Sequence, residues 1–544
     1  MQFAVDPSIG KKIQAMQQRV RWQSAPVKEQ GVDQTHLELQ GESTQTDGFS
    51  FLVIGDSGTG KQGRYNPQYA IADQMKTQVQ DARFVMHTGD VVYLVGSSEY
   101  YKANFIKPYA YLLKGGENTK AINYDNMVFS TPFFPVLGNH DYYDLPLVYG
   151  AIAGLTKKVR KAFPLGVDWD VAWHGSNQGE AYAKAFIDCL DQLGSDQSVT
   201  EHFDKHYVEH EIHPGQTAKC LEYKAGEFTR IPNRYYNFRV DNVDFYALDS
   251  NTFNMPPSDA ERELTDKRRK ELEEVLKEIE SEKQAVRQSI EETRTSRKIT
   301  NKDDREELDD DLEELRGELE RLDEMRRDVE KQLNPSPDDI DWSQLNWLEE
   351  ELVASWKNEA IRGRVLFFHH PPYVTEASKW HQGQTRAIRN NLRNVLDKVG
   401  AALGWQVGDR PLVDLVLNGH AHCLEHIETQ DTGHGDAYTN WIVCGGSGYS
   451  LRRQRREGND LRPEDASPDS PAIAKSNFFF GKEGRGREKK YPYSFLRVDV
   501  EAGTTPPKFT VRPFISERSH KKWHHYEAES FTIQSKGAIA EGEA

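Results

Sequence analysis

The sequence predicts an α/β protein whose polar residues gather at the ends of buried strands. Five short apolar runs recur, and each ends in a cluster of Gly, Asp, Asn or His: "FSFLVIGDSGTG", "ARFVMHTGD", "FFPVLGNHD", "RVLFFHHPP" and "LVDLVLNGHAH". Continuous apolar runs fit strands that are buried on both faces. Helical segments intervene, for example at 67–79 and 342–360, which completes the α/β pattern.

Composition and charge narrow the class of protein. The chain has 544 residues, 37% of them hydrophobic, so most of it should fold, and its net charge of -17 makes nucleic acid an improbable partner. No apolar leader or run of about 18 apolar residues is present, so we expect neither a secretory signal nor a membrane span. The four cysteines are too scattered for a disulfide framework or a CxxC zinc site. We therefore expect a cytoplasmic protein.

The order of segments suggests one divided domain with additions. Residues 1–48 are polar and are interpreted as an N-terminal arm with one short helix near 13–20. Residues 144–230 are mixed in character and rich in Tyr, His and Lys, which indicates an ordered insertion without an assigned role. The α/β domain should then occupy 49–255 and 342–530, and 531–544 should form a flexible tail.

Residues 258–334 carry a heptad pattern that interrupts the α/β domain. Heptad core positions, most of them occupied by hydrophobic residues, recur at alternating spacings of four and three. In the first arm they are Leu272, Leu276, Ile279, Lys283, Val286, Ile290 and Thr293, and in the second Leu308, Leu312, Leu315, Leu319 and Leu322. The segment "RKITNKDD" breaks the repeat and offers Thr300 or Asn301 as an N-cap. These features predict an antiparallel coiled-coil hairpin with arms of roughly 35 residues, about 50 Å long.

Two roles fit this hairpin. It could be a spacer or a spike for association with itself or another protein, or it could gate access of a substrate. The strand ending at Asp249 would normally lead quickly into the helix near Gln344, so the hairpin is an insertion into a connection.

Each polar cluster is ambiguous when it is taken alone. Asp56 could cap a helix, Asn139 could be a turn residue, and Tyr93 could pack in the core. His369 or His370 could each be a buried histidine with a structural hydrogen bond.

Taken together, the clusters predict a metal centre. Ligands of open α/β sheets bind outside the carboxyl ends of strands, which places all five clusters on one rim. Oxygen and imidazole ligands suit borderline divalent metals and iron. The candidate ligands are Asp56, Asp90, Tyr93, Asn139, His369, His420 and His422. Seven ligands exceed one four-coordinate zinc but suit two metals that share a carboxylate, and Asp90 is the natural bridge.

The order GDxG, GDxxY, GNHD, His before x-Pro, and GHxH resembles the calcineurin-like metallophosphoesterases. The DxG form and the Tyr after GD are similar to the purple acid phosphatase branch, as is the segment "NRYYNFRVDNVDFYALDSN". The resemblance covers roughly 49–143, 230–255 and 342–450. It implies an αββα sandwich of two mixed sheets into which the helical hairpin is inserted.

The resemblance also implies roles for individual residues. Asp56, Tyr93 and His422 would hold one metal, Asn139, His369 and His420 the other, and Asp90 would bridge them. His140 would contact the substrate or protonate the leaving oxygen, and His370 would lie just behind the ligands.

The reaction implied is hydrolysis of a small phosphomonoester by in-line attack of a metal-bound hydroxide. Because a phenol has a pKa near 10, binding of Tyr93 as a phenolate favours a hard cation. We therefore expect Fe(III) beside a divalent Fe, Zn or Mn ion, with a visible charge-transfer band.

Substrate contacts are predicted from two further segments. His381 in "WHQGQTRAIRNNL" could line the entrance, and Arg452 and Arg453 in "GGSGYSLRRQRREG" could collect phosphate, since guanidinium matches phosphate oxygens. The arginines could equally belong to a solvated loop paired with the acidic hairpin. Residues 450–490 are interpreted as a loop or lid, and "YSFLRVDV" with "KFTVRPF" as a strand pair.

Two alternatives remain at this point. A phosphodiesterase, nucleotide pyrophosphatase or nuclease would use the same motifs. The other alternative is a coiled-coil interaction protein whose site is vestigial, so that the ligand residues are present but catalyse no reaction.

Overall fold

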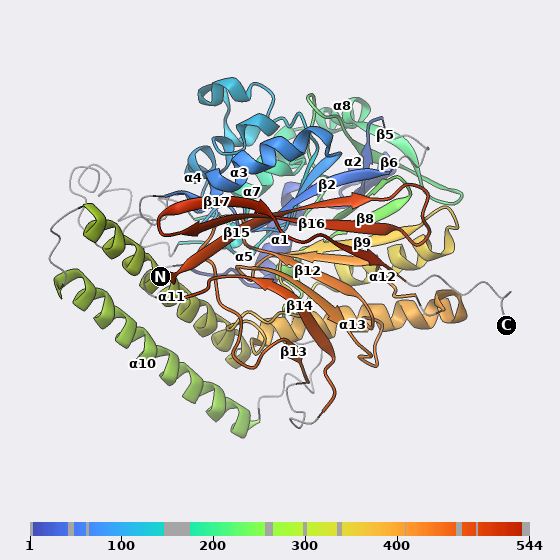
Figure 1. Ribbon diagram of the computed structural model, residues 1–544. Helices are drawn as coiled ribbons and strands as arrows, with labels where there is room; N and C mark the ends of the chain where they lie inside the picture. The colour runs from blue at the N-terminus through green and yellow to red at the C-terminus, as the bar shows by residue number, and fades with distance from the viewer. Residues whose placement is uncertain are drawn as a thin grey trace.

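The computed structural model is built around two mixed β-sheets that face each other (Figure 1). It describes residues 4–41, 48–60, 65–145, 175–255, 265–296, 302–334, 340–408, 410–463, 470–485 and 488–535. The larger sheet has the order β13 (Asp460–Leu461), β14 (Ala474–Phe480), β11 (Leu424–Thr429), β12 (Asn440–Cys444), β10 (Leu415–Asn418), β9 (Gly363–Phe368), β8 (Val243–Ala247), β7 (Tyr236–Val240), β1 (Val32–Leu39), β6 (Gln216–Tyr223) and β5 (Tyr207–His213).

The smaller sheet has the order β17 (Lys522–Glu527), β16 (Lys508–Ser519), β15 (Lys490–Val500), β2 (Phe49–Ile54), β3 (Phe84–His87) and β4 (Phe133–Pro135), with β18 (Phe531–Gln534) paired to β16. Strands β2, β3 and β4 are parallel, whereas β15 and β16 are antiparallel, as their sequences predict. The expected sandwich of two mixed sheets is confirmed.

Helices flank the two sheets, and two of them form a hairpin beside the sandwich. They are α1 (Ile9–Arg19), α2 (Ala25–Glu29), α3 (Pro67–Gln78), α4 (Ser98–Tyr101), α5 (Asn139–Tyr142), α7 (Glu180–Phe186), α8 (Asp196–His206), α10 (Asp266–Ser296), α11 (Lys302–Leu333), α12 (Trp342–Lys357) and α13 (Gly383–Leu403). Single turns occur at 79–81, 102–106, 110–112, 116–121, 124–126, 190–193, 250–252 and 404–407. Among the helices described, none is long and apolar enough to cross a membrane.

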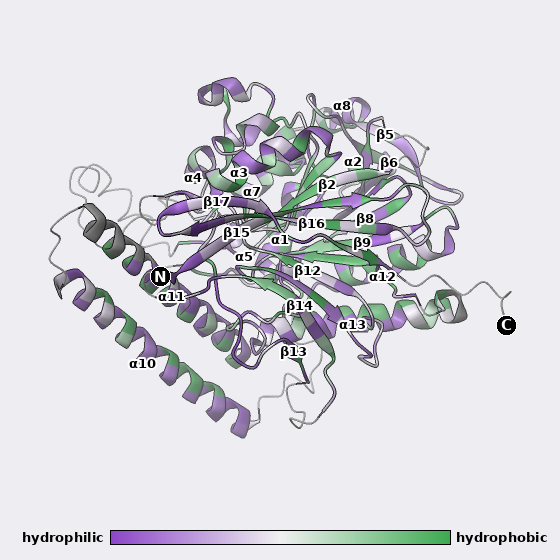
Figure 2. Ribbon diagram, in the orientation of Figure 1, coloured by the Kyte–Doolittle hydropathy of each residue, from purple (hydrophilic) through white to green (hydrophobic). Residues whose placement is uncertain are grey.

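Strand β9 shows why the layers form. Its side chains alternate between two hydrophobic clusters, because successive residues of a strand point to opposite faces. Val365 and Phe367 lie in the cluster between the sheets, whereas Leu366 and Phe368 pack with residues of α12 and α13. The central strands, such as β2 and β9, are accordingly hydrophobic in Figure 2, whereas the edge strand β17 and much of α10 are hydrophilic.

Three terminal and loop segments differ from the sequence-based expectation. Within the supposed arm, β1 lies between β7 and β6, and Met16 and Leu37 are buried in the core. The supposed loop at 450–490 contains β13 and β14, which extend the larger sheet. The supposed tail contains β18, whereas 536–544 lie outside the described residues. These strands were missed because their apolar residues are few or irregularly spaced; β1, for example, has only Val32, Leu37 and Leu39.

The segment 144–230 contributes α7, α8, β5 and β6, and its residues 146–174 lie outside the described part of the chain. The hairpin segment forms two helices of 31 and 32 residues, α10 and α11, which pack along each other through two hydrophobic clusters of their own. The proposed caps Thr300 and Asn301 fall outside the described residues.

Candidate metal centre

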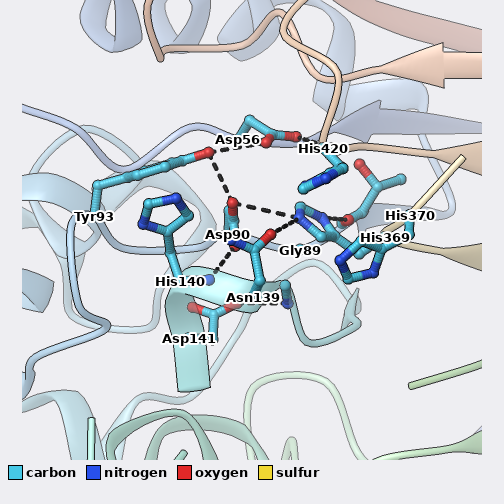
Figure 3. Close-up of polar contacts among 12 residues, drawn as sticks. Asp56, Gly89, Asp90, Tyr93, Asn139, His140, Asp141, His369, His370 and His420 are labelled. Carbon is cyan, nitrogen blue, oxygen red and sulfur yellow. Dashed lines mark hydrogen bonds and ion pairs between the residues drawn. The ribbon is translucent and has the colours of Figure 1, made fainter. Parts of the chain in front are cut away.

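The polar clusters converge because both sheets end at the same place. Asp56 follows β2, Asp90 follows β3, and Asn139 begins α5 just after β4. From the other sheet, His369 follows β9 and His420 follows β10. Figure 3 shows these side chains pointing toward one another from the two sheets.

Two carboxylates and a phenol form the centre of this cluster. The hydroxyl of Tyr93 donates to Asp56 Oδ1 at 2.8 Å and lies 2.9 Å from Asp90 Oδ2. All three side chains are buried. Asp56 and Asp90 also have positive φ angles, 54° and 55°, a left-handed conformation that is uncommon for non-glycine residues and that Asp adopts more readily than most.

Their electrostatics call for a cation. Burial, together with the charge of Asp90, raises the pKa of Asp56 well above its usual value. Burial and the two carboxylates likewise raise the pKa of Tyr93. Two carboxylates and a potential phenolate in a dry site are unfavourable together unless positive charge balances them.

His369 is oriented toward the carboxylates. Its Nε2 lies 3.0 Å from Asn139 Oδ1 and 3.3 Å from Asp90 Oδ2, while its Nδ1 lies 2.8 Å from the carbonyl oxygen of Thr88. Burial lowers the pKa of His369, but the charge and hydrogen bond of Asp90, together with the charge of Asp56 and the carbonyl of Thr88, outweigh burial and raise it to about 9. A proton on Nδ1 donated to Thr88 would leave Nε2 free to bind a metal.

The two histidines of the GHAH motif occupy different surroundings. His422 Nε2 lies 3.5 Å from both Asp56 Oδ1 and the Tyr93 hydroxyl, and within the described residues its buried Nδ1 has no hydrogen-bond partner. Burial, followed by the charge of Arg452, lowers its pKa. The backbone N–H of His420 donates to Asp56 Oδ2 at 2.9 Å, which ties this motif to the smaller sheet.

His140 and His370 flank the cluster. The backbone N–H of His140 donates to Asp90 Oδ1 at 2.8 Å, and its ring lies 4.3 Å from that of Tyr93. His370 Nδ1 lies 2.8 Å from Ser250 Oγ, and burial lowers its pKa.

The predicted substrate contacts divide into near and distant residues. Arg452 lies next to the cluster, because its backbone N–H donates to the carbonyl of His422 at 2.9 Å. Arg453 instead donates to the carbonyl of Gly484 at 2.6 Å. His381 is exposed in the turn before α13. The structure therefore brings Arg452 to the centre, but not Arg453.

Sequence reasoning missed a second ring of polar residues around His420. Its Nε2 lies 2.9 Å from Lys379 Nζ, 3.1 Å from Gln384 Nε2 and 3.1 Å from Glu324 Oε1. Burial and the Lys379 ammonium lower the pKa of His420 to about 3. No motif marks these three residues, and Glu324 belongs to the heptad segment, where charge is expected on the solvated face.

The residues present fit a cation site. Ligand atoms of Asp56, Asp90 and His369 lie within 4.8 Å of one another, and imidazole, carboxylate and phenol suit iron, zinc or manganese. A second such group, His36, Glu38 and His210, lies on β1 and β5, several strands away.

Comparisons with known proteins give distant similarity in structure alone. No protein-family model matches the chain, and no curated protein matches it. Several solved structures are similar, among them the following three. GAP50, the anchor in the inner membrane complex of Plasmodium, has 13% identity and a TM-score of 0.38, with 91% of this chain and 90% of that one covered. Purple acid phosphatase PPD1 from yellow lupin (Lupinus luteus) has 12% identity and a TM-score of 0.42, with 91% and 55% covered. PhoD has 12% identity and a TM-score of 0.37, with 91% and 73% covered.

The chain thus spans about half the length of the lupin protein. Similarity at these identities does not establish a shared activity, because one fold supports many functions.

Proposed function

We propose that this protein is a two-metal phosphoester hydrolase, of the purple acid phosphatase type, that acts on small phosphomonoesters. One observation carries the proposal: six side chains with oxygen or imidazole ligand atoms, from segments up to 366 residues apart, lie in the cluster around the buried Asp90. Such convergence of costly buried groups is typical of functional sites.

The ligands divide into two sets around Asp90. Asp56, Tyr93 and His422 would hold one cation, and Asn139, His369 and His420 the other. When bound, two cations would supply Lewis acidity that activates water near neutral pH and offsets the charge of a phosphate. Because the phenol of Tyr93 lies between two carboxylates, a ferric ion suits the first set of ligands. A divalent Fe, Zn or Mn ion would then occupy the second set.

The remaining groups would bind and move protons. His140 Nδ1 lies 2.6 Å from the carbonyl oxygen of Leu94, which fixes the ring and leaves Nε2 toward the neighbouring carboxylate of Glu320, 3.7 Å away. A proton on Nε2 can be delivered to the leaving oxygen of an ester, a contribution of about 10² to 10⁴ in rate. Lys379 and Arg452 would balance the charge of the phosphate.

The test compares metal-loaded wild type with Asp90→Asn. We expect p-nitrophenyl phosphate turnover and two bound metals in the wild type, and loss of both in the variant. Iron-loaded wild type should absorb visible light, and Tyr93→Phe should abolish this band. Turnover of bis(p-nitrophenyl) phosphate alone would instead favour a phosphodiesterase or nuclease. Bound metal without any turnover would favour an interaction protein with a vestigial site.

We also propose a cytoplasmic location, on composition alone. Fractionation of cells that produce the protein would test it.

A further inference from the structure

Helix α11 of the inserted hairpin lies against the sandwich along much of its length and passes the metal centre at Glu320 and Glu324. In Figure 1, α11 is the hairpin helix nearer to the sandwich, and α10 lies outside it. The residues of α11 that contact the sandwich form one stripe, because they are spaced three or four residues apart. They include Asp311, Glu314, Gly317, Glu320, Glu324, Asp328 and Lys331, and Arg327 flanks the stripe over the ring of Tyr143.

Two carboxylates of this stripe contact the ammonium and imidazole groups that a bound phosphate would need. Glu324 forms an ion pair with Lys379 and lies 3.1 Å from His420 Nε2. Glu320 Oε1 lies 3.7 Å from His140 Nε2. The carboxylate oxygens therefore stand where the negatively charged oxygens of a substrate would pair with the same ammonium and imidazole groups.

Both ends of the stripe are held by polar contacts. At one end, Glu314 pairs with Lys482 at 2.5 Å and also with Lys489. At the other end, Asp328 accepts hydrogen bonds from the first backbone N–H groups of α13, Gly383 at 2.8 Å and Gln384 at 2.9 Å.

Gly317 indicates that this contact is built into the sequence. Glycine in the interior of a helix costs roughly 0.5–1 kcal/mol relative to alanine, so it needs a local reason. A Cβ at this position would lie 3.1 Å from Ser450 Oγ and 3.4 Å from Arg452 Nη1. The absence of a side chain lets the helix approach the loop beside the metal centre.

The hydrophobic residues of α11 face the other way. Leu322, Val329 and Leu333 pack with α10 in a cluster separate from the two clusters of the sandwich. Lifting the hairpin would therefore break ion pairs and hydrogen bonds and expose little apolar surface. Both members of each largely buried pair would regain water when the hairpin lifts, and this relieved desolvation offsets much of the attraction that is lost.

We propose that α11 is an acidic cover that competes with phosphate for Lys379 and His140, so that the hairpin must lift before a substrate binds. This inference rests on the proposed function, because it takes the metal centre as the place where phosphate binds. A cover that is closed in about 90% of molecules lowers the apparent affinity for phosphate about tenfold.

The test uses the full chain loaded with metal, with inorganic phosphate as the probe. Gly317→Leu adds bulk at the contact with Ser450, removes no charge from the site, and favours the helix. We expect it to raise phosphate affinity and kcat/KM for p-nitrophenyl phosphate about tenfold. Ser281→Leu adds the same side chain on the exposed face of α10 and should change neither. Lys482→Ala with Lys489→Ala should act like Gly317→Leu.

Hydrogen exchange gives a readout that does not depend on turnover. The amides of Gly383 and Gln384 should exchange faster in Gly317→Leu, and in the wild type after phosphate is added. Unchanged affinity and exchange in both opened variants would overturn the cover. If affinity and exchange rise but no phosphoester is hydrolysed, the cover stands and the hydrolase assignment fails.

Discussion

At the scale of single residues, Gly89 shows how tightly the metal centre is built. Its φ is +99°, and a Cβ there would lie 2.6 Å from His369 Nδ1 and 2.8 Å from the backbone nitrogen of Gly138. A side chain would therefore push the imidazole away from Asp90. The motif therefore requires glycine at this position, both for its positive φ angle and because there is no room for a Cβ atom.

We predict that Gly89→Ala loses bound metal and about 1–3 kcal/mol of stability. Gly215→Ala is the matched control, because Gly215 also has a positive φ, +79°, but a Cβ there would meet no atom of the described residues within 4 Å. Metal analysis and thermal unfolding measure both effects. Full metal content in Gly89→Ala would contradict this account of the site.

The buried carboxyl of Glu425 gives a prediction for how the stability of the folded protein changes with pH. It is fully buried on β11, and its carboxyl accepts a hydrogen bond from the backbone N–H of Thr375 at 3.0 Å. Burial raises its pKa from 4.5 to about 7. Between these values the unfolded chain releases the proton and the folded chain keeps it, so the wild type loses stability as pH rises from about 4.5 to 7.

Glu425→Gln should remove this loss. The amide resembles the neutral carboxyl, so we expect the variant to gain up to roughly 3 kcal/mol over the wild type above pH 7 and nothing near pH 4. Glu428→Gln, exposed on the same strand, should follow the wild-type profile. Unfolding midpoints between pH 4 and 8 measure the difference, and parallel curves for wild type and Glu425→Gln would refute it.

At the scale of elements, the hairpin contains a charged pair within its interior. Lys283 occupies a heptad position, and its Nζ lies 2.6 Å from Asp323 Oδ1 with both side chains buried. Removing one partner of a buried pair leaves the other charge without compensation, which costs more than replacing both by apolar residues.

We predict that Lys283→Met weakens the hairpin by about 3 kcal/mol and that adding Asp323→Leu restores it. The loss of stability in Lys283→Met should lie at the low end of the roughly 3–5 kcal/mol that breaking a buried pair costs, because Arg326 also lies 3.8 Å from Asp323. Hydrogen exchange of the α10 amides measures the opening free energy. Equal exchange in wild type and Lys283→Met would show that the pair is not structural.

The sequence predicted some elements well and others poorly. The strands that end in Asp56, Asp90 and His369 were predictable, because buried parallel strands are continuous apolar runs. The hairpin helices were predictable from their period. The docking of Glu324 against His420 was not, because a helical period identifies the apolar face and says nothing about what the charged face meets. Strand β1 was missed because only part of it is apolar.

At the scale of the whole molecule, the hairpin leaves and re-enters the sandwich at nearly one point. The backbone N–H of Asp341 donates to the carbonyl of Thr252 at 2.9 Å, and Arg234 pairs with both Asp249 and Asp341 in the interior. The two sides of the insertion are thus held together without the hairpin.

We predict that a chain lacking 262–330 keeps both sheets, because each of the described strands pairs with another strand rather than with the hairpin. Near-UV circular dichroism should retain its signal, and thermal unfolding should stay cooperative. Light scattering of the same protein tests association: if the hairpin joins copies of the chain, its removal lowers the measured mass. A molten product would show that the hairpin is part of the folding unit.

The hydrogen bond that closes this junction also bears on ancestry. A segment whose two ends are neighbours can be gained or lost in one genetic event, because no strand has to change partner. The hairpin and the sandwich of this chain can therefore have separate histories, and relatives with the sandwich but no hairpin are the expected intermediates.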